Sequence, residues 1–245
     1  SRIHTGHRLG SFTQDETGVT AYFFDRGGSH IHTARGDILI GADGLHSFVR
    51  AQLFPNEEPA RFTGTVLWRG ALDWPKFLTG RSMVIAGGMA GKLVLYPIAE
   101  GTRDDRCLMN WAHVQKFAIP YCNAKALIEA TPEFWEYPLC DRDPLPRWAH
   151  GRVTLLGDAA HPMYPVGSNG ASQAILDARC LADRLVDSEH PRHALYAYER
   201  ERLPITSQIV MMNRKGGPEG VIDAVEQRAP DGFSNIDDVL SYEER

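Results

Sequence analysis

The chain has 245 residues, enough for one large domain or two small ones with a hydrophobic core, and its composition is that of an ordinary globular protein. Its formal net charge of −5 argues against a nucleic-acid or anionic-membrane partner, and no apolar run is long enough to span a membrane. The four cysteines lack Cys-x-x-Cys spacing and the ten histidines are scattered, so we expect free thiols and no metal site.

The first residues of the chain are expected to form β-structure. Short strand-like runs at 7–12, 19–24 and 29–33 are separated by turn residues. Apolar and polar residues alternate in the second run, which suits a sheet with one solvated face.

An apolar strand of three residues, 38–40, then enters a turn that contains Asp43 and Gly44. Asp-Gly is among the commonest turn pairs, so the pair alone indicates an ordinary tight turn. A short helix follows, with Ser47 near its start. Arg50 in this helix either holds the segment to its neighbours or is a solvated surface residue, and the sequence leaves both open.

The middle of the chain predicts an antiparallel sheet with strands at 62–72, 82–86, 92–97 and 106–112, followed by a helix at 124–130. Several of its residues combine an aromatic or long side chain with a polar tip and are candidates to line a pocket. These residues are Trp68, Arg69, Tyr96, Asn110 and Trp111. Most aromatic residues of sheets belong to the core, so packing is the alternative interpretation for each.

The most informative segment is a strand, a loop and a helix in succession. Residues 153–156 are an apolar run, 157–169 are rich in glycine and proline, and a helical pattern begins at Gly170. The first amides of a helix lack intrahelical partners and carry about half a positive charge. Here they belong to small residues, which allows a ligand to approach. Asp158 is placed to accept hydrogen bonds from a sugar hydroxyl; the alternative is an ordinary connection with a buried capping aspartate.

The C-terminal part is expected to be helical. A long apolar stripe predicts a helix at 193–214, with Pro204 marking a kink or a break. Residues 216–218 end this helix, and 218–229 and 235–242 are predicted to form short helices.

The string GDAAHPMYPVGSNGASQAILDA at 157–178 resembles the second flavin-binding motif of the single-component FAD-dependent aromatic hydroxylases, the group of p-hydroxybenzoate and salicylate hydroxylases. The amino-acid sequence of this segment is most similar to that of the phenazine-1-carboxylate type of monooxygenase. The Asp-Gly segment at 43–44, followed by a serine and an arginine, resembles an earlier motif of the same group. The two motifs occur in the order found in that family.

The resemblance implies roles for individual residues. Asp158 would bind the ribityl chain of FAD, Pro165 would pack at the isoalloxazine ring, and the amides of 170–172 would face the flavin N1 and C2 carbonyl. Asp43 would lie by the pyrophosphate and ribose, in a motif that the family also links to NAD(P)H. The expected cofactor-binding residues are Asp43, Gly44, Gly157, Asp158, Pro165, Gly167, Asn169, Gly170, Ala171 and Ser172. The expected substrate residues are Trp68, Tyr96 and Trp111.

The resemblance implies an α/β fold: an incomplete FAD/NAD(P)-binding, Rossmann-like domain with an antiparallel-sheet substrate domain. The FAD-binding parts would be 1–55 and 141–190, the substrate sheet 56–140, and C-terminal helices 191–245. The implied activity is hydroxylation of an aromatic small molecule with NAD(P)H and O2 through a flavin C4a-hydroperoxide. No side-chain base is required; Pro165 would lie at the flavin ring. A cytoplasmic location is expected, and a homodimer is one option.

The sequence departs from the family in two places. No Gly-x-Gly-x-x-Gly unit for the ADP phosphates is present, and the cluster at 87–91 lacks that spacing, so residue 1 corresponds to a point beyond the first βαβ unit of a family member. The join at 117–120 is also shorter than expected. We therefore expect weak or no FAD binding by the chain alone. The alternative hypothesis is a flavin-free remnant that binds an aromatic molecule or a partner chain.

Overall fold

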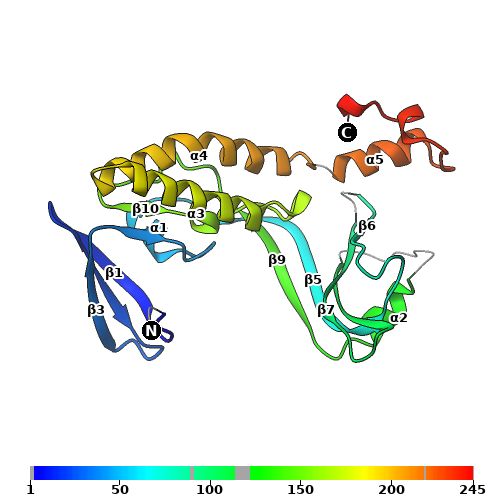
Figure 1. Ribbon diagram of the computed structural model, residues 1–245, viewed down its shortest axis with the longest axis horizontal. Helices are drawn as coiled ribbons and strands as arrows, with labels where there is room; N and C mark the ends of the chain where they lie inside the picture. The colour runs from blue at the N-terminus through cyan, green and yellow to red at the C-terminus, as the bar shows by residue number, and fades with distance from the viewer. Residues whose placement is uncertain (1–2, 89–90, 114–121, 218, 245) are drawn as a thin grey trace. The chain divides into compact units, whose positions relative to one another are not determined.

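The computed structural model describes residues 3–88, 91–113, 122–217 and 219–244, so the short join at 117–120 and part of the glycine cluster at 87–91 lie outside the described residues. The chain divides into two compact units (Figure 1). The first unit comprises Ser1–Arg61 and Cys140–Arg214, and the second comprises Phe62–Leu139 and Lys215–Arg245. The functional roles expected for residues 1–55, 56–140, 141–190 and 191–245 stay predictions, because a division into compact units does not assign a function to any segment.

The first unit opens with an antiparallel sheet of β1 (Arg8–Gln14), β2 (Val19–Phe24) and β3 (His30–Gly36), which confirms the three predicted strands. The turn between β1 and β2 is closed by Asp15, whose Oδ1 accepts hydrogen bonds from the amides of Thr17 and Gly18 at 2.7 and 3.0 Å. An aspartate that binds the backbone two and three residues onward is typical of such turns.

Two strands that are far apart in the sequence form the parallel pair that positions the site. β4 (Leu39–Gly41) pairs with β10 (Val153–Leu155), and the amide of Leu156 donates to the carbonyl of Gly41 at 2.9 Å. Because parallel strands end at the same edge, the loops that follow Gly41 and Leu155 lie next to each other. A Cβ atom at Gly41 would lie 2.7 Å from that of Val49, so this close approach requires glycine.

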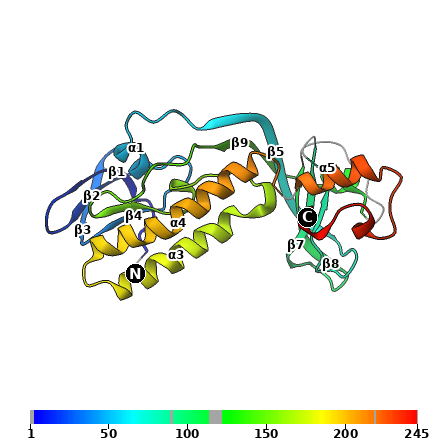
Figure 2. The ribbon, with the colours of Figure 1, turned by 90° about the horizontal axis from the view of Figure 1, so that it is seen from above.

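Three helices complete the first unit: α1 (Phe48–Leu53), α3 (Gly170–Asp187) and α4 (Pro191–Asn213). Figure 2 shows α3 and α4 side by side, joined by a short connection. α4 begins two residues before the predicted start and runs through Pro204 as one helix, so the predicted break does not occur. Packing of α4 against its neighbours compensates for the backbone hydrogen bond that proline cannot make.

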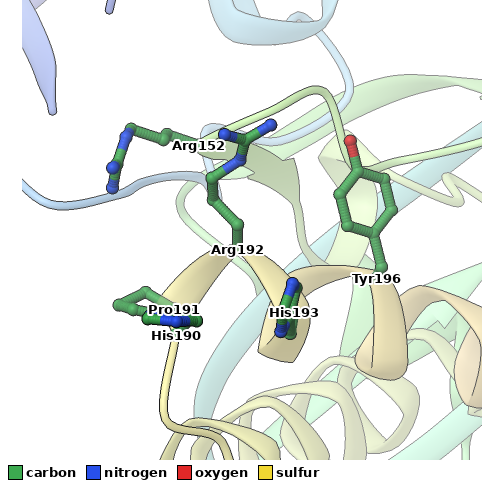
Figure 3. Close-up of a pocket in the computed structure, with 6 residues that line it drawn as sticks. All are labelled: Arg152, His190, Pro191, Arg192, His193 and Tyr196. Atoms are coloured by element: carbon green, nitrogen blue, oxygen red, sulfur yellow. The ribbon is translucent and has the colours of Figure 1, made fainter. Parts of the chain in front are cut away.

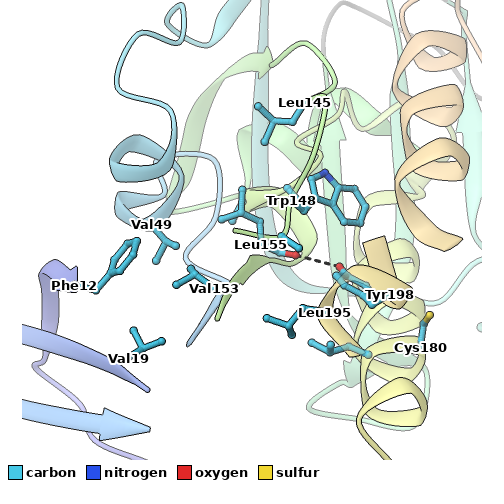
Figure 4. Packing of buried hydrophobic residues seen from close by; sticks show 14 residues of the cluster. Phe12, Val19, Val49, Leu145, Trp148, Val153, Leu155, Cys180, Leu195 and Tyr198 are labelled. Atoms are coloured by element: carbon cyan, nitrogen blue, oxygen red, sulfur yellow. Dashed lines mark hydrogen bonds between the residues drawn. The ribbon is translucent and has the colours of Figure 1, made fainter. Parts of the chain in front are cut away.

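The core of the first unit lies between the parallel pair and the two long helices (Figure 4). Tyr198 of α4 is fully buried, and its hydroxyl donates to the carbonyl of Leu155 at 3.2 Å. Burial raises the pKa of Tyr198 strongly, which keeps the phenol neutral and able to donate. The largest buried residues of this core are Trp148, Tyr198, Leu155, Leu195, Val49 and Val153.

The second unit contains a five-stranded sheet in the order β6 (Val84–Ala86), β7 (Leu93–Glu100), β8 (Arg106–His113), β5 (Arg61–Pro75) and β9 (Phe134–Asp141). The pairs β6–β7, β7–β8 and β5–β8 are antiparallel, as expected. β9 was not predicted. Its Pro138 argues against a central strand, and it lies at the edge of the sheet, where proline is tolerated.

The two faces of this sheet differ in character. One face packs against α2 (Ala124–Glu129) and is called here the helix-covered face. Its buried residues are Leu93, Leu95, Cys107, Met109 and Trp111, with Leu127 from α2. The other face is called here the polar face and carries Arg69, Ala71, Tyr96, Asn110 and Ala112, which are joined by the cross-strand pairs Arg69↔Ala112, Ala71↔Asn110 and Tyr96↔Asn110. Directly opposed residues share a face, so the strand register fixes this division.

The C-terminal segment contains α5 (Glu219–Arg228), which confirms the helix predicted from residue 218, although Pro218 itself lies outside the described residues. The helix predicted at 235–242 is wrong: only two three-residue 3₁₀ turns form, Ile236–Asp238 and Tyr242–Glu244. So short a segment does not recover the cost of helix nucleation. Within the ranges that the structure describes, no helix is long and apolar enough to cross a membrane.

Candidate functional site

The loop after β10 is held against α3 at its first residue. Gly157 has a φ of 61°, and a Cβ atom there would lie 3.1 Å from that of Ala174 on α3. Its amide donates to the Asp177 carboxylate at 3.2 Å. The left-handed backbone and the close approach both favour glycine.

Asp158 follows directly and is exposed. Its carboxylate lies beside the start of α3, because a Cβ atom added at Gly170 would be 3.9 Å from Asp158 Oδ1. No residue in the described part of the chain donates a hydrogen bond to this carboxylate. The alternative of a buried capping aspartate is therefore wrong, and Asp158 is free to accept hydrogen bonds from a ligand.

The first turn of α3 is uncapped. Asn169 stands at the N-cap but its side chain makes no capping hydrogen bond, and the first turn contains no acidic residue. Gly167 and Ser168 precede it with φ values of 70° and 54°, so two successive left-handed residues turn the chain into the helix. The amides of Gly170–Ser172 thus present partial positive charge without a side-chain acceptor from the cap.

Pro165 lies exposed in the same loop, one turn before the helix. The loop is tied to α4 by Asn213, which is 2% exposed and whose Nδ2 donates to the carbonyl of Tyr164 at 3.0 Å. A buried amide that binds the backbone beside Pro165 fixes the path of the loop without covering the proline ring.

The earlier motif uses its aspartate to cap a helix. The carboxylate of Asp43 accepts hydrogen bonds from Ser47 Oγ at 2.5 Å and from the amides of Phe48 and Val49 at 2.7 and 3.3 Å. Gly44 has a φ of 79°, as the turn requires. These contacts are those of a tight turn that begins α1, and the predicted contacts of Asp43 and Gly44 with FAD stay a prediction.

Arg50 joins the two motifs. Its side chain is buried, and Nη1 donates to the carbonyls of Ala159 and Ala160, both at 3.0 Å. The same guanidinium binds Glu57 with two hydrogen bonds, of 2.8 and 2.5 Å. Of the two roles left open by the sequence, that of a solvated residue is wrong, and that of a tether between the segments is confirmed.

A buried ionic cluster lies behind the loop. The Asp177 carboxylate receives hydrogen bonds from His161 Nε2 at 2.5 Å and Arg202 Nε at 2.8 Å, besides that from Gly157. Arg202 also donates to Gln173 Oε1 at 2.6 Å. Burial by itself would raise the pKa of Asp177, but these donors outweigh burial and lower it.

In this cluster His161 acts as a structural hydrogen-bonding residue. Asp177 and Arg202 were not predicted from the sequence. A signal was present, because both charged residues occupy positions within the apolar stripes of their helices, where an unpaired charge would be costly.

The three predicted substrate residues do not share a surface. Trp111 is 1% exposed on the helix-covered face and donates through Nε1 to Thr131 Oγ1 at 2.9 Å. Trp68 joins it, with Ile128 and Phe134, around an apolar pocket of about 210 Å³. Tyr96 lies on the polar face instead. A single ligand cannot lie against both faces, so the predicted substrate contacts separate into two groups.

A larger pocket of about 410 Å³ lies at the start of α4 in the first unit (Figure 3). It is lined by Arg152, His190, Pro191, Arg192, His193 and Tyr196. None of the predicted site residues is among them, and the Arg152 guanidinium is engaged by the carbonyls of Asp15, Glu16 and Asp37. In the part of the chain that the structure describes, no cluster of histidine, cysteine or acidic residues could hold a metal ion.

Comparison with known proteins bears on these motifs. Residues 1–72 and 131–213 match the family described as "FAD binding domain". The chain is 40% identical over 245 aligned positions to the phenazine 1,6-dicarboxylic acid hydroxylase of Lysobacter antibioticus, covering 86% of this chain and 60% of that protein. It is 34% identical to 3-hydroxybenzoate 6-hydroxylase 2 of Aquipseudomonas alcaligenes, covering 87% of this chain and 70% of that protein. The chain thus spans about three fifths of the phenazine relative.

Solved structures show the same fold. Klebsiella pneumoniae HpxO, solved with FAD and uric acid, matches with a TM-score of 0.72 at 24% identity, over 93% of this chain and 63% of that one. A salicylate hydroxylase substrate complex matches with a TM-score of 0.65 at 23% identity, over 98% of this chain and 66% of that one. The expected fold class, an incomplete FAD-binding domain with an antiparallel substrate sheet, is confirmed.

Proposed function

The chain belongs to the FAD-binding-domain family of the flavin-dependent aromatic hydroxylases, and from that premise we propose that it is part of a monooxygenase that hydroxylates an aromatic small molecule. One observation carries the proposal. The uncapped first turn of α3 and the unpartnered carboxylate of Asp158 lie at the carboxyl end of β10, and together they offer donors and an acceptor to one dipolar ligand.

The residues of this loop fit FAD. Asp158 would accept hydrogen bonds from the hydroxyls of the ribityl chain, and the exposed ring of Pro165 would pack against the flavin. The remaining residues proposed to hold the cofactor are Asp43, Gly44, Gly157, Gly167, Asn169, Gly170, Ala171 and Ser172. Bound FAD would supply electron storage and oxygen activation. The amides of 170–172 would stabilise negative charge on the ring through fixed dipoles, which need no reorganisation.

The finer features of the reaction are also proposals. NAD(P)H would supply the electrons and O2 the oxygen atom, by the activation route that the resemblance implies. The two relatives are named for a phenazine dicarboxylic acid and a hydroxybenzoate, so we propose an aromatic acid as the substrate class. A cytoplasmic location and, as an option, a homodimer complete the proposal.

The test is a titration of the purified chain with FAD, followed by flavin fluorescence and by the flavin absorbance bands. We expect saturable binding that Asp158→Ala weakens at least tenfold, because a hydrogen bond to a charged group contributes about 1.5–3 kcal/mol. Asp183→Ala, which removes an exposed carboxylate from helix α3 that follows the loop, is the matched control and should bind like the native chain. Equal affinity of the Asp158 variant would reject the assigned role. No saturable binding up to millimolar FAD would favour the flavin-free alternative.

A further inference from the structure

The polar face of the second unit holds a cluster of hydrogen-bond donors around Arg69. Arg69 Nε donates to Asn110 Oδ1 at 2.9 Å, and Nη2 donates to the Tyr96 hydroxyl at 2.6 Å. Asn110 is 4% exposed, whereas Arg69 is exposed. The buried amide and the tyrosine therefore fix the plane of a guanidinium whose remaining N–H groups find no acceptor among the described residues.

The cluster has donors in excess. Arginine only donates, so Asn110 must turn its oxygen toward Arg69, and its Nδ2 is left buried without a partner. The Tyr96 oxygen accepts from Arg69, which leaves the hydroxyl hydrogen available to donate. Arg69 Nη1, Asn110 Nδ2 and the Tyr96 hydroxyl thus supply donors for which the described residues provide no acceptor.

Three other cations of the second unit are paired with carboxylates. Arg106 pairs with Asp73, and Lys92 pairs with Glu219. Lys76 pairs with Glu100 at 3.0 Å. Arg69 has no carboxylate partner among the described residues, and both groups that hold it are neutral. A fixed cation with neutral neighbours and spare donors is complementary to an anionic oxygen ligand.

The surface next to this cluster is shaped for a flat molecule. On β5 and β8 the residues directly opposite Arg69 and Asn110 are Ala112 and Ala71, whose side chains end at a methyl group. On the β7 side, the neighbours of Ala112 and Asn110 are Val94 and Tyr96. A planar ring can approach the sheet over the two alanines, while a carboxylate on its rim reaches the guanidinium.

We propose that Arg69, positioned by Asn110 and assisted by Tyr96, binds the carboxylate of the aromatic substrate and makes the chain select an acid over a neutral analogue. The inference rests on the proposed function for the aromatic ring, and it adds the residue that recognises the acid. The planar guanidinium matches a carboxylate with two parallel N–H···O bonds, which lysine cannot reproduce.

The test compares phenazine-1-carboxylate with phenazine-1-carboxamide, which differ in charge and little in shape, by equilibrium dialysis against the full chain in the presence of FAD. We expect the native chain to bind the acid at least tenfold more tightly than the amide. Arg69→Met should abolish this preference, Arg69→Lys should keep part of it, and Tyr96→Phe should weaken acid binding a few-fold. Arg81→Met is the matched control and should leave the preference unchanged, since Arg81 is also exposed but lies in the connection between β5 and β6.

Circular dichroism and thermal unfolding identify variants that fail to fold, and Arg69→Lys keeps the test decisive if Arg69→Met does so. An acid preference that survives in either folded variant at the native level overturns the inference, as does a native chain that binds both ligands equally or neither. FAD binding is measured in the same samples. FAD uptake without acid preference rejects only the role of Arg69, whereas acid preference without FAD uptake rejects only the flavin proposal.

Discussion

Two arginine clusters, one in each unit, show opposite ways of holding a charge. Arg202 in the first unit donates to the buried carboxylate of Asp177, which also binds His161 and the amide of Gly157. Arg69 in the second unit donates only to a neutral amide and a neutral hydroxyl. The first cluster is called closed here, because the arginine is neutralised by a carboxylate of the protein. The second is open, because the charge of Arg69 has no counterpart among the described residues.

The difference separates a structural role from a ligand-binding role. A buried arginine without a counter-charge would destabilise the fold, so the first unit closes its cluster where the loop at 157–169 meets α3 and α4. Arg69 is exposed, so water can solvate it until a ligand replaces that water. The predictions below test whether closure and openness have these consequences.

The largest effect is expected at Asp177. Replacing Asp177 with alanine leaves Arg202 buried without a counter-charge and should lower the free energy of unfolding by about 3–5 kcal/mol. Urea denaturation of the full chain measures this change. Adding Arg202→Met to the Asp177 variant removes the stranded charge and should restore part of the loss. A decrease in the free energy of unfolding of less than about 1 kcal/mol for Asp177→Ala would show that Arg202 does not need Asp177 as its counter-charge.

The next effect is expected at Arg50. Arg50→Met deprives the carbonyls of Ala159 and Ala160 and the carboxylate of Glu57 of their donor, and should cost about 2–4 kcal/mol in unfolding free energy. Because these carbonyls belong to the loop at 157–169, which is proposed to bind FAD, the same variant should also weaken FAD binding. Arg50→Lys keeps the charge but not the planar donor geometry, so it should recover only a fraction of both properties. Recovery of both to native levels would show that charge alone suffices.

Low pH should weaken the cluster around Asp177 and lower the stability of the chain. The pKa of Asp177 is lower in the folded chain than the value of about 3.9 for an unfolded aspartate. The carboxylate therefore contributes stability at pH values above the unfolded pKa, and this contribution is lost as the pH falls through the folded pKa. Urea midpoints of the native chain should fall more steeply below about pH 4 than those of Asp177→Asn. Parallel curves for the two proteins would contradict this expectation.

The smallest effect on stability, and the sharpest test of the comparison, is the conversion of the open cluster into a closed one. Ala112→Asp places a carboxylate on the strand position opposite Arg69. We expect the unfolding free energy to stay within about 1 kcal/mol of the native value, since exposed ion pairs contribute little. Binding of phenazine-1-carboxylate should nevertheless fall at least tenfold, because the guanidinium then has an internal partner. Unchanged affinity would show that the ligand does not use Arg69.

The parts of the fold and of the candidate site that could be predicted are those encoded by residues close together in the sequence. The strand, the loop and the helix that begins at Gly170 follow from periodicity and from small residues within one segment, and they were predicted. The cluster at Asp177 was not, since Gly157, Asp177 and Arg202 come from separate segments whose meeting is decided by packing.

The strand register of the second unit could not be predicted from the sequence either. The positions of Trp68 and Trp111 do not reveal which face each takes, because a shift of one residue in register reverses every side chain. The observed pairing of Gly70 with Trp111 puts both indoles on the helix-covered face and Tyr96 on the other. β9 escaped prediction because Pro138 is compatible with a strand only at an edge, and edge position is a property of the assembled sheet.

The left-handed turn at Gly167 and Ser168 has a consequence for sequence variation in this loop. If both positions were randomised and the survivors selected for flavin retention, glycine should dominate at 167, while glycine, asparagine or aspartate should compete successfully with serine at 168. Valine and isoleucine should be depleted at both. The amino acids tolerated at these two positions would then be determined by the left-handed backbone conformation and not by side-chain contacts with the flavin.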